Sequence, residues 1–272
     1  MTEMASTVDV LRKRVVRLLK LNESNDPSEL TRLVLPRLQA LGNAALIGGA
    51  IRDLAIGGRR RFSSDLDFVV YDGSRASFHD AMTRSGARPN RFGGFALKFP
   101  TWKVDVWHIE DTWAHTAGLK EVHSLKDLLK CTFFDWDSIV FDVSSRKLIC
   151  EATYLSRLRA GVMEVRLLEN PNPDGSLVRA LRRAALWDVK FGLKLCEFSI
   201  SRLRSTPWDK LVALDDMAFS SAVLRYLNRD ILIERLEEGL EIGRAPQVVP
   251  RWNRQPMLPF SDNTDVAPMN WQ

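Results

Sequence analysis

The sequence predicts an α+β protein in which a domain built on a mixed β-sheet precedes a smaller helical domain. In the first part of the chain, short β-branched stretches such as "DLDFVVYDG" alternate with segments whose apolar residues recur at helical spacing. After "NPNPDGS" (170–176), whose prolines, asparagines and Asp-Gly step indicate a loop, helical periodicity runs almost unbroken to residue 240. With 272 residues and 45% hydrophobic content, the chain is long enough for two modest cores.

The first domain is expected to span residues 1–168. Apolar residues with helical spacing predict helices at 8–21, 26–42, 50–56 and 76–86, and Asp26 or Ser28 supplies a cap for the second. The buried run "AALIGG" and the alternating stretch 65–73 predict strands, the latter closed by the turn-forming pair Asp72-Gly73. A strand-turn-strand at 93–111, a helix leading into a strand at 124–143 and a hairpin partner at 144–152 complete this domain.

Two further parts follow. A helical domain is expected at 169–242, and residues 243–272 form an extended, proline-rich tail with little periodicity. The net charge of +5 and the pI near 9.2 suit a polyanionic partner without requiring one. Three widely separated cysteines, the lack of an apolar leader and the lack of a long apolar run indicate a cytoplasmic protein with no membrane span.

Three aspartates are the candidate catalytic and metal-binding residues. Asp65 and Asp67 lie two positions apart at the start of a predicted strand, so both side chains point to the same face. Such a pair repels unless a cation lies between the carboxylates, and Mg²⁺ prefers hard oxygen ligands of this kind. Asp105, between Val104 and Val106 in "KVDVWHI", is a candidate third ligand for a pair of Mg²⁺ ions. The alternative is that Asp105 meets solvent on an edge strand.

A glycine pair upstream is the candidate phosphate site. Gly48 and Gly49 follow a predicted buried strand and precede a helix, where backbone N–H groups and the helix N-terminus attract phosphate. Arg52, one turn into this helix, could fork onto phosphate oxygens, and Asp53 could steady the turn. The basic segment "GGRRRF" (57–62) joins this helix to the aspartates, as a solvated loop or as a contact for triphosphate or acceptor.

These residues carry a family resemblance. "GGAIRDLAIG" followed by "SDLDFVV" resembles the head domain of class II CCA-adding enzymes and bacterial poly(A) polymerases, in the DNA polymerase β-like nucleotidyltransferase superfamily. The family pattern Gly-Gly-x-x-Arg-Asp-x-x-x-Gly, a basic loop and Asp-x-Asp is matched by Gly48, Gly49, Arg52, Asp53, Gly57, Asp65 and Asp67. The resemblance implies a polymerase β-like head with a mixed β-sheet followed by a helical neck.

The resemblance also implies an activity. A family member would use two Mg²⁺ ions, held by Asp65, Asp67 and Asp105, to transfer NMP from an NTP (ATP or CTP) to an acceptor hydroxyl, an RNA or tRNA 3′ end being favoured. The nucleotide-binding residues implied are Gly48, Gly49, Arg52, Asp53, Ser64, Arg179 and Arg182. The two arginines come from "DGSLVRALRRAALWDVKFGLKL", which looks like the neck helix and keeps an Arg-x-x-Arg step.

Later motifs depart from the family pattern. "CTFFDWDSIVFD" (131–142) keeps the apolar frame of the next block but lacks its arginine pair, and Asp137 stands where the family has Asn. The base-reading Glu-Asp-x-x-Arg motif of the neck has no clear counterpart. Few residues follow the neck, so a minimal transferase is expected rather than a housekeeping CCA-adding enzyme. A non-catalytic nucleotide- or RNA-binding module and a toxin- or defence-type transferase stay open as alternatives, as do the acceptor and the oligomeric state.

Overall fold

The computed structural model describes residues 4–21, 30–58, 64–90, 92–99 and 102–249. The chain divides into two compact units, Met1–Arg159 and Ala160–Gln272, which we name the sheet unit and the helical unit. The division therefore falls slightly before the boundary expected at residue 168. The expected helix cap at Asp26 or Ser28, most of the basic segment 57–62 and the end of the tail (250–272) lie outside the described residues.

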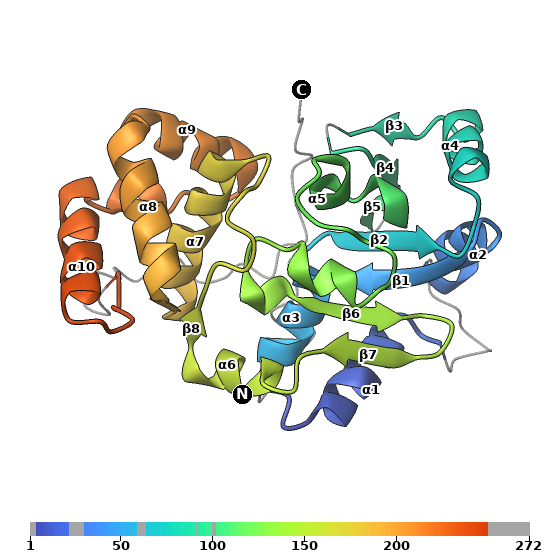
Figure 1. Cartoon of the computed structure of the whole chain (residues 1–272), viewed down its shortest axis with the longest axis horizontal. Coiled ribbons are helices and arrows are strands. Elements are labelled where there is room, and N and C mark those ends of the chain that lie inside the picture. The colour runs from blue at the N-terminus through green and yellow to red at the C-terminus, as the bar shows by residue number, and fades with distance from the viewer. Residues whose placement is uncertain (1–3, 22–29, 59–63, 91, 100–101, 250–272) are drawn as a thin grey trace. The chain divides into compact units, whose positions relative to one another are not determined.

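The sheet unit is built on a seven-stranded sheet with the order β3-β4-β5-β2-β1-β6-β7 (Figure 1). β2 and β5 pair in parallel and the remaining neighbours pair antiparallel, which confirms the predicted mixed sheet. The strands are β1 Asn43–Ile47, β2 Leu66–Tyr71, β3 Arg88–Pro89, β4 Phe95–Lys98, β5 Lys103–His108, β6 Ile139–Asp142 and β7 Lys147–Cys150.

The predicted helices of this unit are largely present. They are α1 Val8–Leu18, η1 Leu30–Val34, α2 Leu35–Gln39, α3 Gly49–Gly57 and α4 Arg75–Arg84. Three short helices were not predicted: η3 Ile109–Asp111, α5 Trp113–Thr116 and α6 Tyr154–Ala160. Of these, α3 packs against β1, β2 and β6, and α1 packs against α3. The loop-to-helix connection from β1 into α3 therefore lies directly beside the start of β2.

One predicted helix is wrong in kind. The segment 124–137 forms two short 3-10 helices, η4 Asp127–Lys130 and η5 Asp135–Asp137, before β6 begins. Its buried residues Leu125, Leu128 and Leu129 pack into one core cluster with Val69 and Val140 of the sheet. Their spacing of three and four positions is also that of an α-helix, so the apolar pattern alone does not separate the two kinds of helix.

The core lies around the central strands. Leu46 of β1, Phe68 of β2 and Phe141 of β6 are fully buried, as are Val69 and Val70. Burying a side chain of this size contributes roughly 1.5–3 kcal/mol relative to leaving it in water. The apolar side chains of the central strands thus anchor the middle of the sheet in the core.

The helical unit confirms the run of helices predicted after residue 170. It contains α7 Pro173–Trp187, α8 Leu193–Ser205, α9 Trp208–Ala218, η6 Leu224–Tyr226 and α10 Arg229–Glu241, with a small parallel pair of β8 Val162–Met163 and β9 Lys190–Phe191. α7 begins where Asn172 Oδ1 accepts a hydrogen bond from Gly175 N, with Pro173 at the first helical position. Within the described ranges, no helix is long and apolar enough to cross a bilayer.

Candidate active site

Three carboxylates lie on one face of the sheet unit's central strands. In the parallel β2–β5 pair, Asp67 is the register partner of Asp105. Residues paired in this way project to the same face, and Asp65 shares that face because it lies two positions before Asp67. Val104 and Val106, on either side of Asp105, are buried on the opposite face. The sheet thus gathers the three aspartates that were proposed as metal ligands, from two strands far apart in sequence.

The surroundings raise the pKa of two of these aspartates. Burial raises the pKa of Asp65 although the residue keeps contact with solvent, and the positive charge of Lys103 opposes this rise. Burial also raises the pKa of Asp105, and the negative charge of Asp65 raises it further. The second effect requires the two carboxylates to be near each other. A cation bound between these carboxylates would stabilise their ionised forms.

Asn90, which was not among the predicted site residues, orients Asp105. Its Oδ1 atom accepts hydrogen bonds from the backbone N–H groups of Phe92 (2.9 Å) and Gly94 (3.0 Å). The amide NH₂ group therefore points away from this turn and donates to Asp105, which opposes the rise in the Asp105 pKa. The sequence signal was the Asn and glycine pair in "ARPNRFGG", which is typical of a turn and does not reveal a partner on β5.

The donor chemistry of this face fits Mg²⁺. All three side chains offer hard carboxylate oxygens, as Mg²⁺ requires, and their mutual repulsion favours a bound cation. Across the residues that the structure describes, however, no three or more His, Cys, Asp or Glu side chains are already gathered as a metal-binding cluster. The face therefore supplies suitable ligands without a preassembled coordination sphere.

The glycine pair forms the entry to helix α3. Gly48 has a φ of 77°, a backbone conformation that favours glycine, and its N–H group donates to Ile139 O at 2.9 Å. A side chain at Gly49 would place its Cβ atom 2.9 Å from Ser64 Oγ, so glycine is needed for close packing. The N-terminus of this nine-residue helix consequently lies against the residue that precedes Asp65.

Arg52 and Asp53 tie the same helix to Ser64. Arg52 donates from Nε and Nη2 to Asp53 Oδ1, at 3.0 and 2.8 Å, and from Nη2 to Ser64 Oγ at 3.0 Å. The other carboxylate oxygen of Asp53 accepts from Ser64 N (3.2 Å) and Ser64 Oγ (2.8 Å). Both charged side chains are almost fully buried. The first turn of α3 is thereby bonded to the start of β2.

A second carboxylate completes this network. Arg52 Nη1 donates to Asp137 Oδ1, from the η5 turn. Burial alone would lower the Arg52 pKa, but the charges of Asp137 and Asp53 outweigh it and raise the pKa above its ordinary value. The guanidinium that was expected to fork onto phosphate is thus bonded to two carboxylates and a hydroxyl. Asp137 drew notice in the sequence only as a departure from a family pattern.

The two predicted nucleotide-binding arginines of the neck belong to the helical unit. Arg182 is buried and donates from Nη1 to Asp215 Oδ1 (2.6 Å) and Ser221 O (2.7 Å), with its guanidinium 3.8 Å from the centre of the Phe219 ring. Arg179 is exposed and donates to Ser176 Oγ at 3.1 Å. On the same helix, one arginine is therefore built into the core and the other is accessible.

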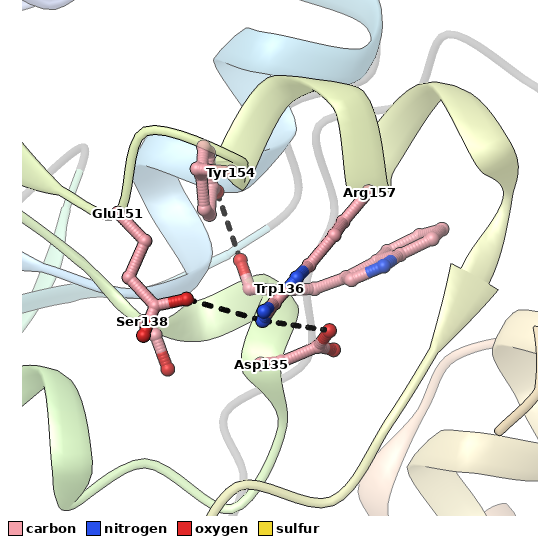
Figure 2. A pocket seen from close by; sticks show the side chains of 6 residues that line it. All are labelled: Asp135, Trp136, Ser138, Glu151, Tyr154 and Arg157. Carbon is pink, nitrogen blue, oxygen red and sulfur yellow. Dashed lines mark hydrogen bonds and ion pairs between the residues drawn. The ribbon is translucent and has the colours of Figure 1, made fainter.

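A small polar pocket lies beside the η5 turn (Figure 2). It is lined by Asp135, Trp136, Ser138, Glu151, Tyr154 and Arg157. Arg157 reaches between two carboxylates, with Nη1 3.2 Å from Glu151 Oε2 and 3.9 Å from Asp135 Oδ2. The buried Tyr154 hydroxyl donates to Trp136 O at 2.8 Å. These contacts hold the turn from which Asp137 reaches Arg52.

The fold that these elements define is that of a nucleotidyltransferase head domain with a mixed sheet, followed by helices. Among solved structures, a CCA-adding enzyme with CTP is 16% identical to this chain. The match covers 86% of this chain and 55% of the enzyme, with a TM-score of 0.51. A CCA-adding enzyme with ATP is 16% identical, and the match covers 84% of this chain and 53% of the enzyme with a TM-score of 0.51. For an apo form of a CCA-adding enzyme the identity is 17%, the match covers 75% of this chain and 50% of the enzyme, and the TM-score is 0.50.

The similarity to these structures is partial in length and low in sequence identity. The chain spans about half the length of these CCA-adding enzymes, and at this level of identity the similarity establishes the fold. No protein-family model matches the chain, and no curated protein matches it either.

Proposed function

We propose that the chain is a Mg²⁺-dependent nucleotidyltransferase of the cytoplasm. It would transfer NMP from an NTP to an acceptor hydroxyl, with an RNA or tRNA 3′ end as the favoured acceptor, and would release pyrophosphate. The observation that carries the proposal is the register pairing of Asp67 with Asp105, joined by Asp65 on the same face. Carboxylates on one face of neighbouring strands repel an anion that binds alone, whereas they suit a cation-dependent phosphoryl transfer.

Each carboxylate has a role in this proposal. Asp65, Asp67 and Asp105 would hold two Mg²⁺ ions, which when bound neutralise charge on the transferring phosphoryl group. Asp105 would also accept the proton of the acceptor hydroxyl, and Asn90 would keep this carboxylate turned toward the site. The acceptor oxygen forms a bond to the α-phosphorus, the bond from that phosphorus to the bridging oxygen breaks, and pyrophosphate leaves.

The entry to α3 would bind the triphosphate. Gly48 and Gly49 expose the helix N-terminus to an anion, and the positive end of the helix dipole adds to the attraction. Arg52, Asp53 and Ser64 would form the base of this subsite, where their hydrogen bonds hold the entry to α3 in place. In the helical unit, Arg179 is proposed as a nucleotide contact because it is exposed, whereas Arg182 is bonded to Asp215 in the core.

ATP and CTP are the proposed nucleotides. CCA-adding enzymes of the same fold have been solved with CTP and with ATP, which supports a triphosphate of this kind as the substrate. Segment 131–142 has diverged, and the family's base-reading motif has no clear counterpart. The family pattern therefore does not predict which of the two nucleotides this chain prefers. Parallel assays with each nucleotide therefore form part of the test.

The experiment is transfer of an α-phosphate label. The full chain is incubated with each α-labelled NTP, Mg²⁺ and total RNA, and label in RNA is measured alongside pyrophosphate release. The proposal expects Mg²⁺-dependent labelling by the wild type, its loss in the double variant Asp65→Ala, Asp67→Ala, and its retention in Asp80→Asn, a control at an exposed aspartate on α4. Labelling that survives the double substitution contradicts the site. NTP binding that needs no Mg²⁺ would instead define a non-catalytic binding module.

A further inference from the structure

A buried chain of hydrogen bonds joins the η5 turn to the strand that carries two of the proposed metal ligands. It runs from Asp137 to Arg52, from Arg52 to Asp53 and Ser64, and from Asp53 to Ser64. Ser64 is the residue immediately before Asp65. Asp137 lies 85 positions from Arg52 in the sequence, so this connection exists only in the folded chain.

We infer that Asp137 is a positioning residue of the site: by fixing Arg52 it fixes Ser64, and with Ser64 the start of β2 where Asp65 and Asp67 lie. This inference rests on the proposed function. It assigns a role to a charged residue of the diverged segment 131–142 that bonds to helix α3. Asp137 itself touches neither substrate nor metal in this scheme.

The distribution of acceptors explains why Asp137 is needed. Asp53 uses Oδ1 for Nε and Nη2 of Arg52 and Oδ2 for Ser64, so its two oxygens are already engaged. The remaining guanidinium nitrogen, Nη1, donates to Asp137. A buried cation that loses such an acceptor is left poorly paired and moves to regain one. Movement of Arg52 would break the hydrogen bond from its Nη2 atom to Ser64 Oγ, and would also shift Asp53, which bonds to both Arg52 and Ser64.

The η5 turn is anchored independently of Arg52, so Asp137 can act as a fixed point. Tyr154 donates to Trp136 O at 2.8 Å, and the hydroxyls of Ser138 and Thr132 lie 2.7 Å apart. The backbone then continues into β6, which pairs with β1 and accepts the Gly48 N–H group. The turn is therefore braced from both sides, whereas the start of β2 is held from the Asp53 and Arg52 side chains.

Three variants test this role. Asp137→Ala removes the acceptor, Asp137→Asn keeps an oxygen that can accept from Arg52, and Asp142→Asn is a matched control at the other end of β6. We expect Asp137→Ala to lower kcat about 10- to 100-fold, as is typical when a residue that orients a ligand is lost, with a smaller change in KM. Asp137→Asn should retain most of kcat, and Asp142→Asn should resemble the wild type.

Hydrogen exchange gives a readout that does not depend on activity. In the nucleotide-free protein, amides of residues 64–67 should exchange faster in Asp137→Ala, while Asp137→Asn and Asp142→Asn leave them unchanged. Unchanged exchange in Asp137→Ala, or equal loosening in the control, overturns the inference. So does a lowered Tm with kcat unchanged, which marks a merely structural role. If Asp137→Ala does not fold, Ser64→Ala breaks the same chain at its other end and should lower kcat in the same range.

The two claims fail in different ways. A wild type that transfers no label and binds no NTP ends the proposed function, while exchange at residues 64–67 still decides whether Asp137 holds the strand. A wild type that transfers label, with Asp137→Ala equally active, leaves the function in place and ends the positioning role.

Discussion

Asp67 of β2 and Asp105 of β5 face each other in register across the parallel pair of a sheet whose other described pairings are antiparallel. Like charges placed directly opposite on neighbouring strands destabilise a sheet. A cation bound between the two carboxylates would relieve this repulsion. This is the relationship from which the predicted metal dependence follows.

Neutralising either member of this pair should abolish most activity. Asp67→Asn and Asp105→Asn keep the size of the side chain but remove the charge that a metal ligand supplies. We expect each to reduce kcat/KM by at least about 100-fold, since losing residues that merely orient a ligand costs 10- to 100-fold. Steady-state pyrophosphate release checks this. Activity within a few-fold of the wild type in both variants would exclude the pair from the site.

The pH dependence should have an acid limb set by Asp65 and Asp105. Both must be ionised to bind a cation, and burial raises the pKa of each, so activity falls as the pH drops through these raised values. Lys103 opposes the rise at Asp65, so Lys103→Met should move the acid limb to higher pH. Lys98→Met is the control, because Lys98 is the register partner of Lys103 on β4 and does not act on Asp65. A limb that stays in place, or moves to lower pH, contradicts this electrostatic picture.

The proposed catalytic carboxylates should destabilise the metal-free protein. The pKa of Asp105 is raised above its ordinary value of 3.8 in the folded state, so its contribution to stability is lost as the pH rises through the folded pKa. Asp105→Asn should therefore raise the Tm at pH 7 without Mg²⁺ and have no such effect well below pH 3.8.

Adding Mg²⁺ provides the matching control for this stability effect. A ligand that binds only the folded state stabilises it, so Mg²⁺ should raise the Tm of the wild type more than that of Asp105→Asn. Thermal unfolding scans at both pH values, with and without the ion, make the comparison. If Asp105→Asn is less stable than the wild type at pH 7 without Mg²⁺, ionised Asp105 does not destabilise the metal-free protein.

Substitutions at the two neck arginines should have different effects: loss of the Arg182–Asp215 pair should lower stability, and loss of Arg179 should lower nucleotide affinity. Removing Asp215 leaves the buried Arg182 charge without its carboxylate, which should cost about 3–5 kcal/mol of unfolding free energy. Arg179→Ala alters an exposed residue, so its unfolding free energy should stay within about 0.5 kcal/mol of the wild type while nucleotide affinity falls. Urea denaturation and nucleotide titration measure the two effects. Unchanged nucleotide affinity in Arg179→Ala removes this residue from the proposed binding set.

Local patterns predicted the elements that carry the site. The glycine pair after a buried strand gave the turn into α3, and the β-branched run after Asp65 gave β2, because both depend on neighbours in the sequence. The mixed sheet was also predicted correctly. The helix predicted before β6 was wrong in kind because the apolar spacing of Leu125, Leu128 and Leu129 suits an α-helix as well as the 3-10 helix that forms.

Contacts between residues far apart in the sequence could not be predicted from local sequence patterns. The register of Asp67 with Asp105 depends on β5 pairing in parallel with β2 after an intervening helix and hairpin. In the same way, the contact between Arg52 and Asp137 depends on η5 lying against α3. The sequence therefore indicated which residues carry charge near the site, and the folded chain decided which of those charges bond to one another.

The measurement that tests the central claim most directly is calorimetric titration of the full chain with ATP and with CTP, in Mg²⁺ and again in EDTA. The account predicts binding of at least one nucleotide in Mg²⁺, loss of that binding in EDTA, and the same loss in Asp67→Asn with Mg²⁺ present. Equal affinity with and without Mg²⁺, or no binding of either nucleotide by the wild type, would contradict it.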